Sequence, residues 1–405
     1  CEQAEPAVKG TKLVRREVVR VVTPGTAIDA QLIENKESVY LASVCEAGGS
    51  IGAAFLELST GEFVTTQISG PDQWPKLTGL LDGYAPRELL FPPELAAQVG
   101  RYFGRPDQGG QLLSNEGADE RAAKSPRAFG LSLTQLEKDD FELADGELLL
   151  RSQFNVRELK GFGLDDKPAA VRAAAACLKY AHFTQKASAR HVTAIKHFES
   201  SDCLVLDQLT LRNLEIVQPR NDAGKRTLFD VIDETVTGMG GRLLRSWLLR
   251  PSLKRSEIET RLSAVEELVD PILRDKLRFL MKQVADLERL VGRLNLGNVT
   301  ARDLLSLAST LDQTPKVIGS IADARSLLIQ VLAENIFELP EIRSLIAAGI
   351  VDDPPGNIGD GGTIRFGFNA ELDDLRSLSS DAKKLIAEFE ERERARTGIA
   401  NLKIR

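Results

Sequence analysis

The stretch VYLASVCEAGGSIGAAFLELSTGEFVTTQI, residues 39–68, decides how the first part of the chain folds. Three short apolar runs are separated by Gly48-Gly49 and by Ser59-Thr60-Gly61-Glu62. Short runs rich in β-branched and aromatic residues, joined by glycine-containing turns, are typical of an antiparallel meander. We therefore predict three strands, over residues 39–44, 51–58 and 63–68.

Helices and strands alternate after this meander. The pattern predicts a helix near 72–82, a buried strand at Leu89-Leu90-Phe91 and a helix over 94–103. Such alternation is typical of a mixed α/β domain. Residues 104–127 are rich in Gly, Pro and polar side chains and predict a loop. We assign residues 28–128 to the α/β domain and residues 1–27, with their basic cluster, to a preceding tail and linker.

From residue 129 the pattern predicts helix after helix, so residues 129–405 are assigned to a mainly α-helical domain. Four consecutive alanines within 168–181 strongly favour a helix. From Asn369 to Thr397 neither Pro nor Gly interrupts the apolar spacing, which predicts a helical rod of roughly 40 Å. Within it, Glu388 with Arg392 and Glu390 with Arg394 have the spacing of stabilising ion pairs.

Helix boundaries are marked clearly between residues 225 and 315. Pro251 should end one helix, and Ser256 with Glu259 predicts a capping box at the start of the next. Asp270-Pro271 should open a helix that continues to Gly297. Two further helices are expected to start at Thr300, three residues before Asp303, and at Thr314-Pro315.

Composition excludes several classes of protein. The net charge of −7 argues against a surface that binds DNA along its whole length, because phosphate binding requires basic residues. The four cysteines form no CxxC pair, which argues against a zinc site or a disulfide framework and favours the cytoplasm. No apolar run reaches the roughly 20 residues needed to cross a bilayer. The chain begins with Cys1 and residues 401–405 resemble the start of a strand, so we expect an internal segment of a longer protein.

Glycine-rich motifs give no nucleotide site. A phosphate-binding loop follows GxxxxGK[ST], and Gly224-Lys225 fails this pattern because Pro219 and Arg226 occupy required positions. The run Gly238–Gly241 is better explained by a helix start behind Thr237 or by close helix packing. Gly359–Gly362 does not precede a helix and predicts a turn.

Titratable residues give no catalytic or metal site either. His182, His191 and His197 lack the spacing of two ligands on one helical face. Two acidic pairs and two charged runs are best explained as solvated surface: Asp139-Asp140, Asp165-Asp166, residues 390–394 and the basic residues within 9–20. The basic residues within 9–20 are also a weaker candidate for DNA contact. We predict no catalytic, cofactor-binding or metal-binding residue, and the sequence does not identify nucleic-acid-binding residues.

Several longer stretches resemble one family. VVRVVTPGT at 18–26 is similar to the join between the mismatch-binding and connector domains of MutS proteins, and Cys1-Glu2-Gln3 resembles the end of the first of these. LELSTGEF at 56–63 resembles the connector hairpin. The helical half is similar to the MutS core and lever at LRNLEI (211–216), TLF (227–229), TGMGGRLLRSWL (237–248), GFNAELD (367–373) and ERERARTGI (391–399).

The resemblance covers essentially the whole chain and implies a specific organisation. Residues 1–27 would be the tail of the mismatch-binding domain and a linker, 28–128 an RNase H-like connector, and 129–405 a core and lever that stop before the clamp. The family implies a DNA-dependent ATPase that uses ATP and Mg²⁺, closes as a homodimer on mismatched double-stranded DNA and recruits MutL. Its Walker motifs would lie outside this chain, so the segment would be no enzyme and would couple the ATPase end to the DNA end.

Two other functions remain open from the sequence. The chain could be a stand-alone helical scaffold or interaction protein, or part of a MutS relative that acts in recombination. Neighbouring motifs in the gene would separate these hypotheses, because a GxxxxGK[ST] downstream and a Phe-x-Glu upstream together support the mismatch sensor.

Overall fold

The computed structural model describes residues 2–3, 16–29, 33–104, 130–199, 201–219, 226–356 and 360–399. The chain folds as two compact units. The first consists of Cys1–Val299 and Gln313–Phe337, and the second of Thr300–Asp312 and Glu338–Arg405.

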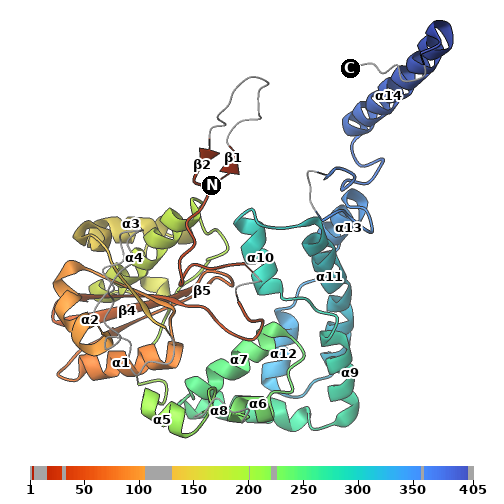
Figure 1. The fold of residues 1–405 in the computed structure, drawn as a ribbon. Coiled ribbons are helices and arrows are strands. Elements are labelled where there is room, and N and C mark those ends of the chain that lie inside the picture. Colours follow the sequence, from red (N-terminus) through yellow and green to blue (C-terminus); the bar gives the residue numbers. More distant parts are fainter. Residues whose placement is uncertain are drawn as a thin grey trace. The chain divides into compact units, whose positions relative to one another are not determined.

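A mixed β-sheet forms the centre of the α/β domain (Figure 1). Its strand order is β7-β6-β3-β4-β5-β8. The predicted meander is confirmed, since β3, β4 and β5 are antiparallel neighbours, while β6, β7 and β8 each join a neighbour in parallel. The strands are β3 Leu41–Ala47, β4 Ser50–Glu57, β5 Glu62–Ile68, β6 Glu88–Phe91, β7 Ser132–Gln135 and β8 Lys196–His197. A separate ladder pairs β1 Glu2–Gln3 with β2 Arg16–Glu17.

Helices cover both faces of this sheet (Figure 1). One hydrophobic cluster lies between the sheet and the first two helices of the domain, and a second lies between the sheet and the next two helices along the chain. Strand β4 is therefore buried along its whole length, which explains its nearly continuous apolar sequence. The helices are α1 Gln73–Tyr84 and α2 Ala96–Phe103 on one face and α3 Leu143–Phe154 and α4 Pro168–Gln185 on the other, with short 3₁₀ turns at Pro93–Leu95, Lys138–Phe141 and Lys160–Phe162.

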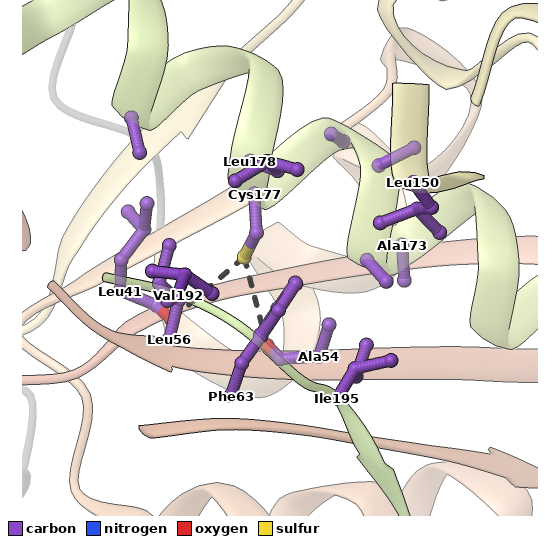
Figure 2. Packing of buried hydrophobic residues seen from close by; sticks show 14 of the residues in the cluster. Leu41, Ala54, Leu56, Phe63, Leu150, Ala173, Cys177, Leu178, Val192 and Ile195 are labelled. Carbon is purple, nitrogen blue, oxygen red and sulfur yellow. Dashed lines mark hydrogen bonds between the residues drawn. The ribbon is translucent and has the colours of Figure 1, made fainter. Parts of the chain in front are cut away.

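Small side chains let α4 lie directly on the strands. Cys177 points from α4 into the sheet, where its Sγ approaches the carbonyl oxygens of Leu41 at 3.8 Å and Ala54 at 3.9 Å (Figure 2). Burial raises the pKa of this thiol to about 12. At the other end of the helix, a Cβ on Gly52 would lie only 2.0 Å from the carbonyl oxygen of Ala169. The alanines of α4 thus serve close packing against a sheet.

This packing corrects the predicted domain boundary. The boundary at 128/129 lies too early, because β7, α3, α4 and β8 all belong to the sheet and its two hydrophobic clusters. The α/β domain therefore extends to about residue 198. An alanine-rich helix has the same pattern whether it packs on helices or on strands, so its sequence does not reveal its neighbour. The predicted loop at 104–127 lies almost entirely outside the described residues.

The remainder of the chain is mainly helical, which confirms the predicted fold class of an α/β domain followed by helices. In the first unit the helices are α5 Gln208–Asn213, α6 Leu228–Ile232, α7 Gly238–Leu249, α8 Arg255–Glu267, α9 Pro271–Met281, α10 Leu287–Asn295 and α12 Leu327–Glu334, and α11 Ala301–Ile321 contributes residues to both units. Among the described residues, no helix combines the length and apolar character that a bilayer crossing requires.

Three predicted helix boundaries are wrong. Ser256 and Glu259 form no capping box, because α8 already begins at Arg255, which pairs with Glu259 instead. The helix expected from Pro271 to Gly297 is interrupted, since Asp286 caps a new helix, α10. Pro315 starts no helix and lies inside α11, although proline there removes a backbone donor.

The second unit contains the predicted long helix. It is α14, Ala370–Thr397, and it begins where the Asn369 side chain accepts from the backbone N–H of Leu372 at 2.9 Å. It ends at Gly398, which has a left-handed φ of 71°. The predicted pair of Glu390 with Arg394 forms at 3.0 Å. This unit also contains α13 Pro340–Gly349.

Gly52→Ala should destabilise the chain by about 3 kcal/mol, because the new methyl group would meet backbone of α4 that cannot rotate away. Gly100→Ala in α2 is the matched control, since nothing lies within 4 Å of its Cβ position. It should stabilise by up to about 1 kcal/mol through helix propensity. Urea unfolding measures both changes, and equal effects of the two substitutions would contradict this packing.

Candidate functional site at the junction of sheet and helices

Two arginines join the helices of the first unit to the chain that leads into β3. Arg242 lies on α7 and Arg289 on α10, and each is only 5% exposed. Arg242 Nη1 donates to the carbonyl oxygen of Asn35 at 3.0 Å. Arg289 donates from Nη1 to the carbonyl oxygen of Glu34 at 3.0 Å and from Nη2 to that of Glu37 at 2.5 Å. We call these two arginines, their acidic partners and segment 33–38 the junction.

Arg242 also pairs with two acidic side chains. Its guanidinium forms two hydrogen bonds to Asp286, at 2.6 and 2.9 Å, and one to Glu288 at 2.6 Å. Burial opposes the charge of Arg242, but the hydrogen bonds that it donates to Asp286 and Glu288 outweigh this effect and raise its pKa above the ordinary value. Burial also acts to raise the pKa of Asp286, yet hydrogen bonding from Arg242 keeps it lowered. This fork-like pairing fixes both distance and orientation.

The charge of Arg289 is less well compensated by acidic side chains. Its guanidinium pairs with the carboxyl group of Glu57 at a long distance, with Nη2 and Oε1 3.8 Å apart. Its Nε is buried without a hydrogen-bond partner among the described residues. Burial and the neighbouring charge of Arg242 lower the pKa of Arg289. Arg289 is thus held mainly by backbone carbonyls, which makes its position dependent on the exact path of segment 33–38.

Glu57 ends β4 at the sheet side of the junction and is 1% exposed. Its Oε1 accepts from Ser59 Oγ at 3.0 Å. Burial raises the pKa of Glu57 from 4.5 to about 7, with Glu62 acting in the same direction and Arg242 and Arg289 in the opposite one. The junction therefore contains a carboxyl group that titrates near neutral pH.

A second contact runs from α7 into the core of the sheet. The guanidinium of Arg250 lies 3.8 Å from the centre of the Tyr84 ring, and Tyr84 stacks on Phe55 with ring centres 4.0 Å apart. Arg250 also donates to the carbonyl oxygen of Gly83 at 3.0 Å and to Ser246 Oγ at 2.6 Å. A desolvated cation on an aromatic face contributes about 2 kcal/mol, so this stack supports the junction independently.

Glycines bring the backbones of the junction close together. A Cβ on Gly292 of α10 would lie 2.2 Å from the carbonyl oxygen of Ser59, and one on Gly241 would lie 2.5 Å from Lys36 Cγ. Lys36 passes this glycine to pair with Asp233 at 2.6 Å. The run Gly238–Gly241 therefore begins a helix and permits close packing, as predicted, and Thr237 caps that helix.

A cavity of about 390 Å³ adjoins the junction. Its lining includes Glu57, Glu62, Glu288, Arg242 and His191. Burial lowers the pKa of His191, whose Nε2 is 2.7 Å from the carbonyl oxygen of Leu58. Among the described residues, no three His, Cys, Asp or Glu side chains are grouped so that they could hold a metal ion. The geometry supports positioning of two structural elements and identifies no reacting atoms.

The other sequence motifs lie apart from the junction. Arg20 of the basic tail pairs with Asp29, and Asp140 pairs with Lys179. Gly361 and Gly362 have positive φ angles, in agreement with the predicted turn. His182 and His197 each have a pKa lowered by burial and do not join His191. Several motif residues lie outside the described residues: Lys9, Lys12, Arg15, Gly224, Lys225, Gly359 and residues 401–405.

Sequence reasoning missed the charged residues of the junction. Glu57 interrupts the apolar run FLEL, and Arg242 and Arg289 lie on the same helices as apolar core positions. The signal that could have identified them is a charged residue at a position that the strand or helix periodicity predicts to face the core. Their partners are up to 255 residues away in the chain, so no local pattern could have paired them.

Comparison with known families agrees with this organisation. Residues 39–198 match the model of MutS domain II, and residues 209–402 match that of MutS domain III. The chain belongs to the MutS family. The end of the first match, at residue 198, coincides with the end of the α/β domain.

Curated relatives give the same assignment. The chain is 40% identical over 414 residues to the DNA mismatch repair protein MutS of Solibacter usitatus, which it covers to 44%. It is 39% identical to that of Symbiobacterium thermophilum, covering 44%, and 40% identical to that of Myxococcus xanthus, covering 43%. In each case the whole of this chain is aligned. The chain thus spans less than half the length of these MutS relatives.

Glu57→Gln should flatten the dependence of stability on pH. Because folding raises the pKa of Glu57 from 4.5 to about 7, its contribution to the free energy of unfolding is complete below pH 4.5 and is lost as the pH rises through 7. The unsubstituted chain should lose on the order of 3 kcal/mol relative to the variant across this window. Urea unfolding at several pH values measures the difference.

Glu94→Gln is the control for this titration. Glu94 is exposed and lies 3.7 Å from the exposed Lys138, so its substitution shows the effect of removing a surface carboxyl group from the same domain. A Glu57→Gln variant with the same pH dependence as the unsubstituted chain would show that Glu57 does not titrate in this window.

Proposed function

We propose that this chain is the connector and core part of a DNA mismatch repair protein and that it transmits displacement between the α/β domain and the helices. The family membership and the names of the relatives support the repair function. The observation that supports the coupling role is the junction, in which Arg242 and Arg289 are buried against the backbone of segment 33–38.

Separating the two sides of this junction would destabilise the protein strongly. A buried charge that loses its partner destabilises a protein by about 3–5 kcal/mol. Sliding of α7 or α10 along segment 33–38 would remove Arg242 and Arg289 from carbonyl oxygens at fixed positions along the chain. A displacement of either side is therefore passed on to the other, which suits a mechanical link between distant sites.

The chemistry of the whole protein is part of the same proposal. We assign no enzymatic step to this chain, and we infer that ATP and Mg²⁺ are bound by other parts of the protein. Binding of mismatched double-stranded DNA, pairing as a homodimer and recruitment of MutL in the cytoplasm are inferred for the full-length protein. This chain would connect its ATP-binding and DNA-binding ends.

The test uses the full-length protein with Arg242→Ala and Arg289→Ala combined. Mismatch affinity should change by less than about threefold, because these residues lie at an internal junction. Release from a mismatched duplex after addition of ATP should slow by about tenfold, equivalent to about 1.4 kcal/mol of lost coupling. Stopped-flow fluorescence of a labelled duplex measures both quantities.

Arg255→Ala provides the matched control. Arg255 pairs with Glu259 on its own helix, and its side chain is 90% exposed. This control should release DNA at the unsubstituted rate. An equally fast release by the junction variant, with mismatch binding intact, would show that the junction does not carry the coupling.

A further inference from the structure

A second set of contacts fastens the chain that precedes the sheet. We call residues 16–29 the strap. The backbone N–H of Val21 donates to the carbonyl oxygen of Thr184 at 2.7 Å, and Gln185 Nε2 donates to that of Thr26 at 3.0 Å. Thr26 is 1% exposed, and Ile28 belongs to the core cluster beneath α4. The strap therefore lies on the α/β domain and contributes to its core.

Glu88, the first residue of β6, holds the turn of the strap. It is 1% exposed. Its Oε2 accepts from the backbone N–H of Gly25 at 3.1 Å. Its Oε1 accepts from Thr134 Oγ1 at 2.7 Å and from the Tyr180 hydroxyl at 2.8 Å. One buried carboxyl group thus connects the strap to β7 and to α4, using donors from three different segments.

The turn itself fits this position closely. A Cβ on Gly25 would lie 2.8 Å from Glu88 Cβ and 2.9 Å from Leu41 Cδ1, so a side chain at position 25 would displace the turn. The turn is closed by a hydrogen bond of 3.1 Å from the N–H of Thr26 to the carbonyl oxygen of Thr23. The N–H of Thr23 in turn donates to the Thr26 hydroxyl at 3.3 Å. The backbone donors of the turn are thus satisfied either within it or by Glu88.

The strap and the junction meet at the same end of the sheet. Leu41, the first residue of β3, is paired with Glu88 on one side and with Leu56 on the other. Glu88 and Glu57 therefore flank the start of β3, one facing the strap and one facing the junction. The chain that is fastened at Gly25 continues to segment 33–38, where Arg242 and Arg289 hold it.

We propose that the turn Thr23–Thr26 is a latch, with Glu88 as its positioning residue, that makes the chain before the turn move together with the α/β domain. This proposal rests on the proposed coupling function and adds a second coupling point to it. A displacement arriving through the strap reaches the sheet through Glu88, and segment 33–38, which comes later in the chain, is held to the helices by Arg242 and Arg289. The ion pair of Arg20 with Asp29, at 2.8 Å, joins the chain before the turn to the chain after it and helps the strap move as a unit.

Hydrogen–deuterium exchange of the full-length protein tests the latch directly. In Glu88→Gln, one of the two side-chain oxygens becomes an NH2 group, which donates hydrogen bonds and does not accept them. The side chain then cannot accept from all three donors at once. Amides of residues 18–28 should then exchange faster by about tenfold or more, while amides of β4 keep their protection. Glu57→Gln is the matched control, since Glu57 is equally buried and faces the junction.

A second pair of variants covers the case in which Glu88→Gln disturbs the sheet. Gln185→Ala removes the bond to Thr26, and its control is Gln153→Ala, which removes bonds of 2.8 and 2.9 Å to the loop at Ala189 and Val192. Faster exchange of the strap amides in Gln185→Ala, with unchanged exchange in Gln153→Ala, supports the latch. Unchanged strap exchange in both Glu88→Gln and Gln185→Ala overturns it. That result would leave the junction test unaffected, since the junction test measures DNA release by variants at Arg242 and Arg289.

Discussion

The burial of two guanidinium groups against the backbone of segment 33–38 is the constraint on which the first unit depends. An arginine cannot lose its charge, so removing it from water requires that nearby acceptors replace its hydration. Arg242 obtains these acceptors from Asp286 and Glu288, and Arg289 obtains them mainly from carbonyl oxygens. Segment 33–38 must therefore follow one path, and that path fixes where β3 begins relative to α7 and α10.

Other features of the chain follow from this arrangement. Asp286 pairs with Arg242 and also caps α10, which is why the helix expected to run from Pro271 to Gly297 is divided there. Gly241 leaves room for the Lys36 side chain, and Gly292 leaves room for the backbone of Ser59. The Arg250 stack on Tyr84 then secures α7 to a ring that is itself stacked on the central strand. Polar contacts determine the register of the two elements, and aromatic packing adds stability.

The sequence predicted the meander, the two following helices and the long terminal helix because each depends on contacts between near neighbours. It placed the domain boundary too early, since the alanine pattern of α4 is the same on a sheet as in a helical bundle. It also predicted no site residues, because Glu57, Glu88, Arg242 and Arg289 acquire their roles from partners far away in the chain. The motifs that resemble MutS proteins do include Arg242, Glu57 and the turn at Thr23–Thr26, so the resemblance marked regions whose physical role only the structure supplies.

If the junction holds as described, the α/β domain and the helices α7 and α10 behave as one body. Pulsed electron spin resonance between labels at Arg101→Cys on α2 and Asn295→Cys on α10, with Cys1 and Cys203 replaced by serine, tests this most directly. Both labelled positions are exposed. We expect one narrow distance distribution that persists at about 0.5 M salt, because buried ion pairs are little screened, and that broadens when Arg242 and Arg289 are replaced by alanine. A broad or two-peaked distribution in the protein with an intact junction would contradict the coupling of these two parts.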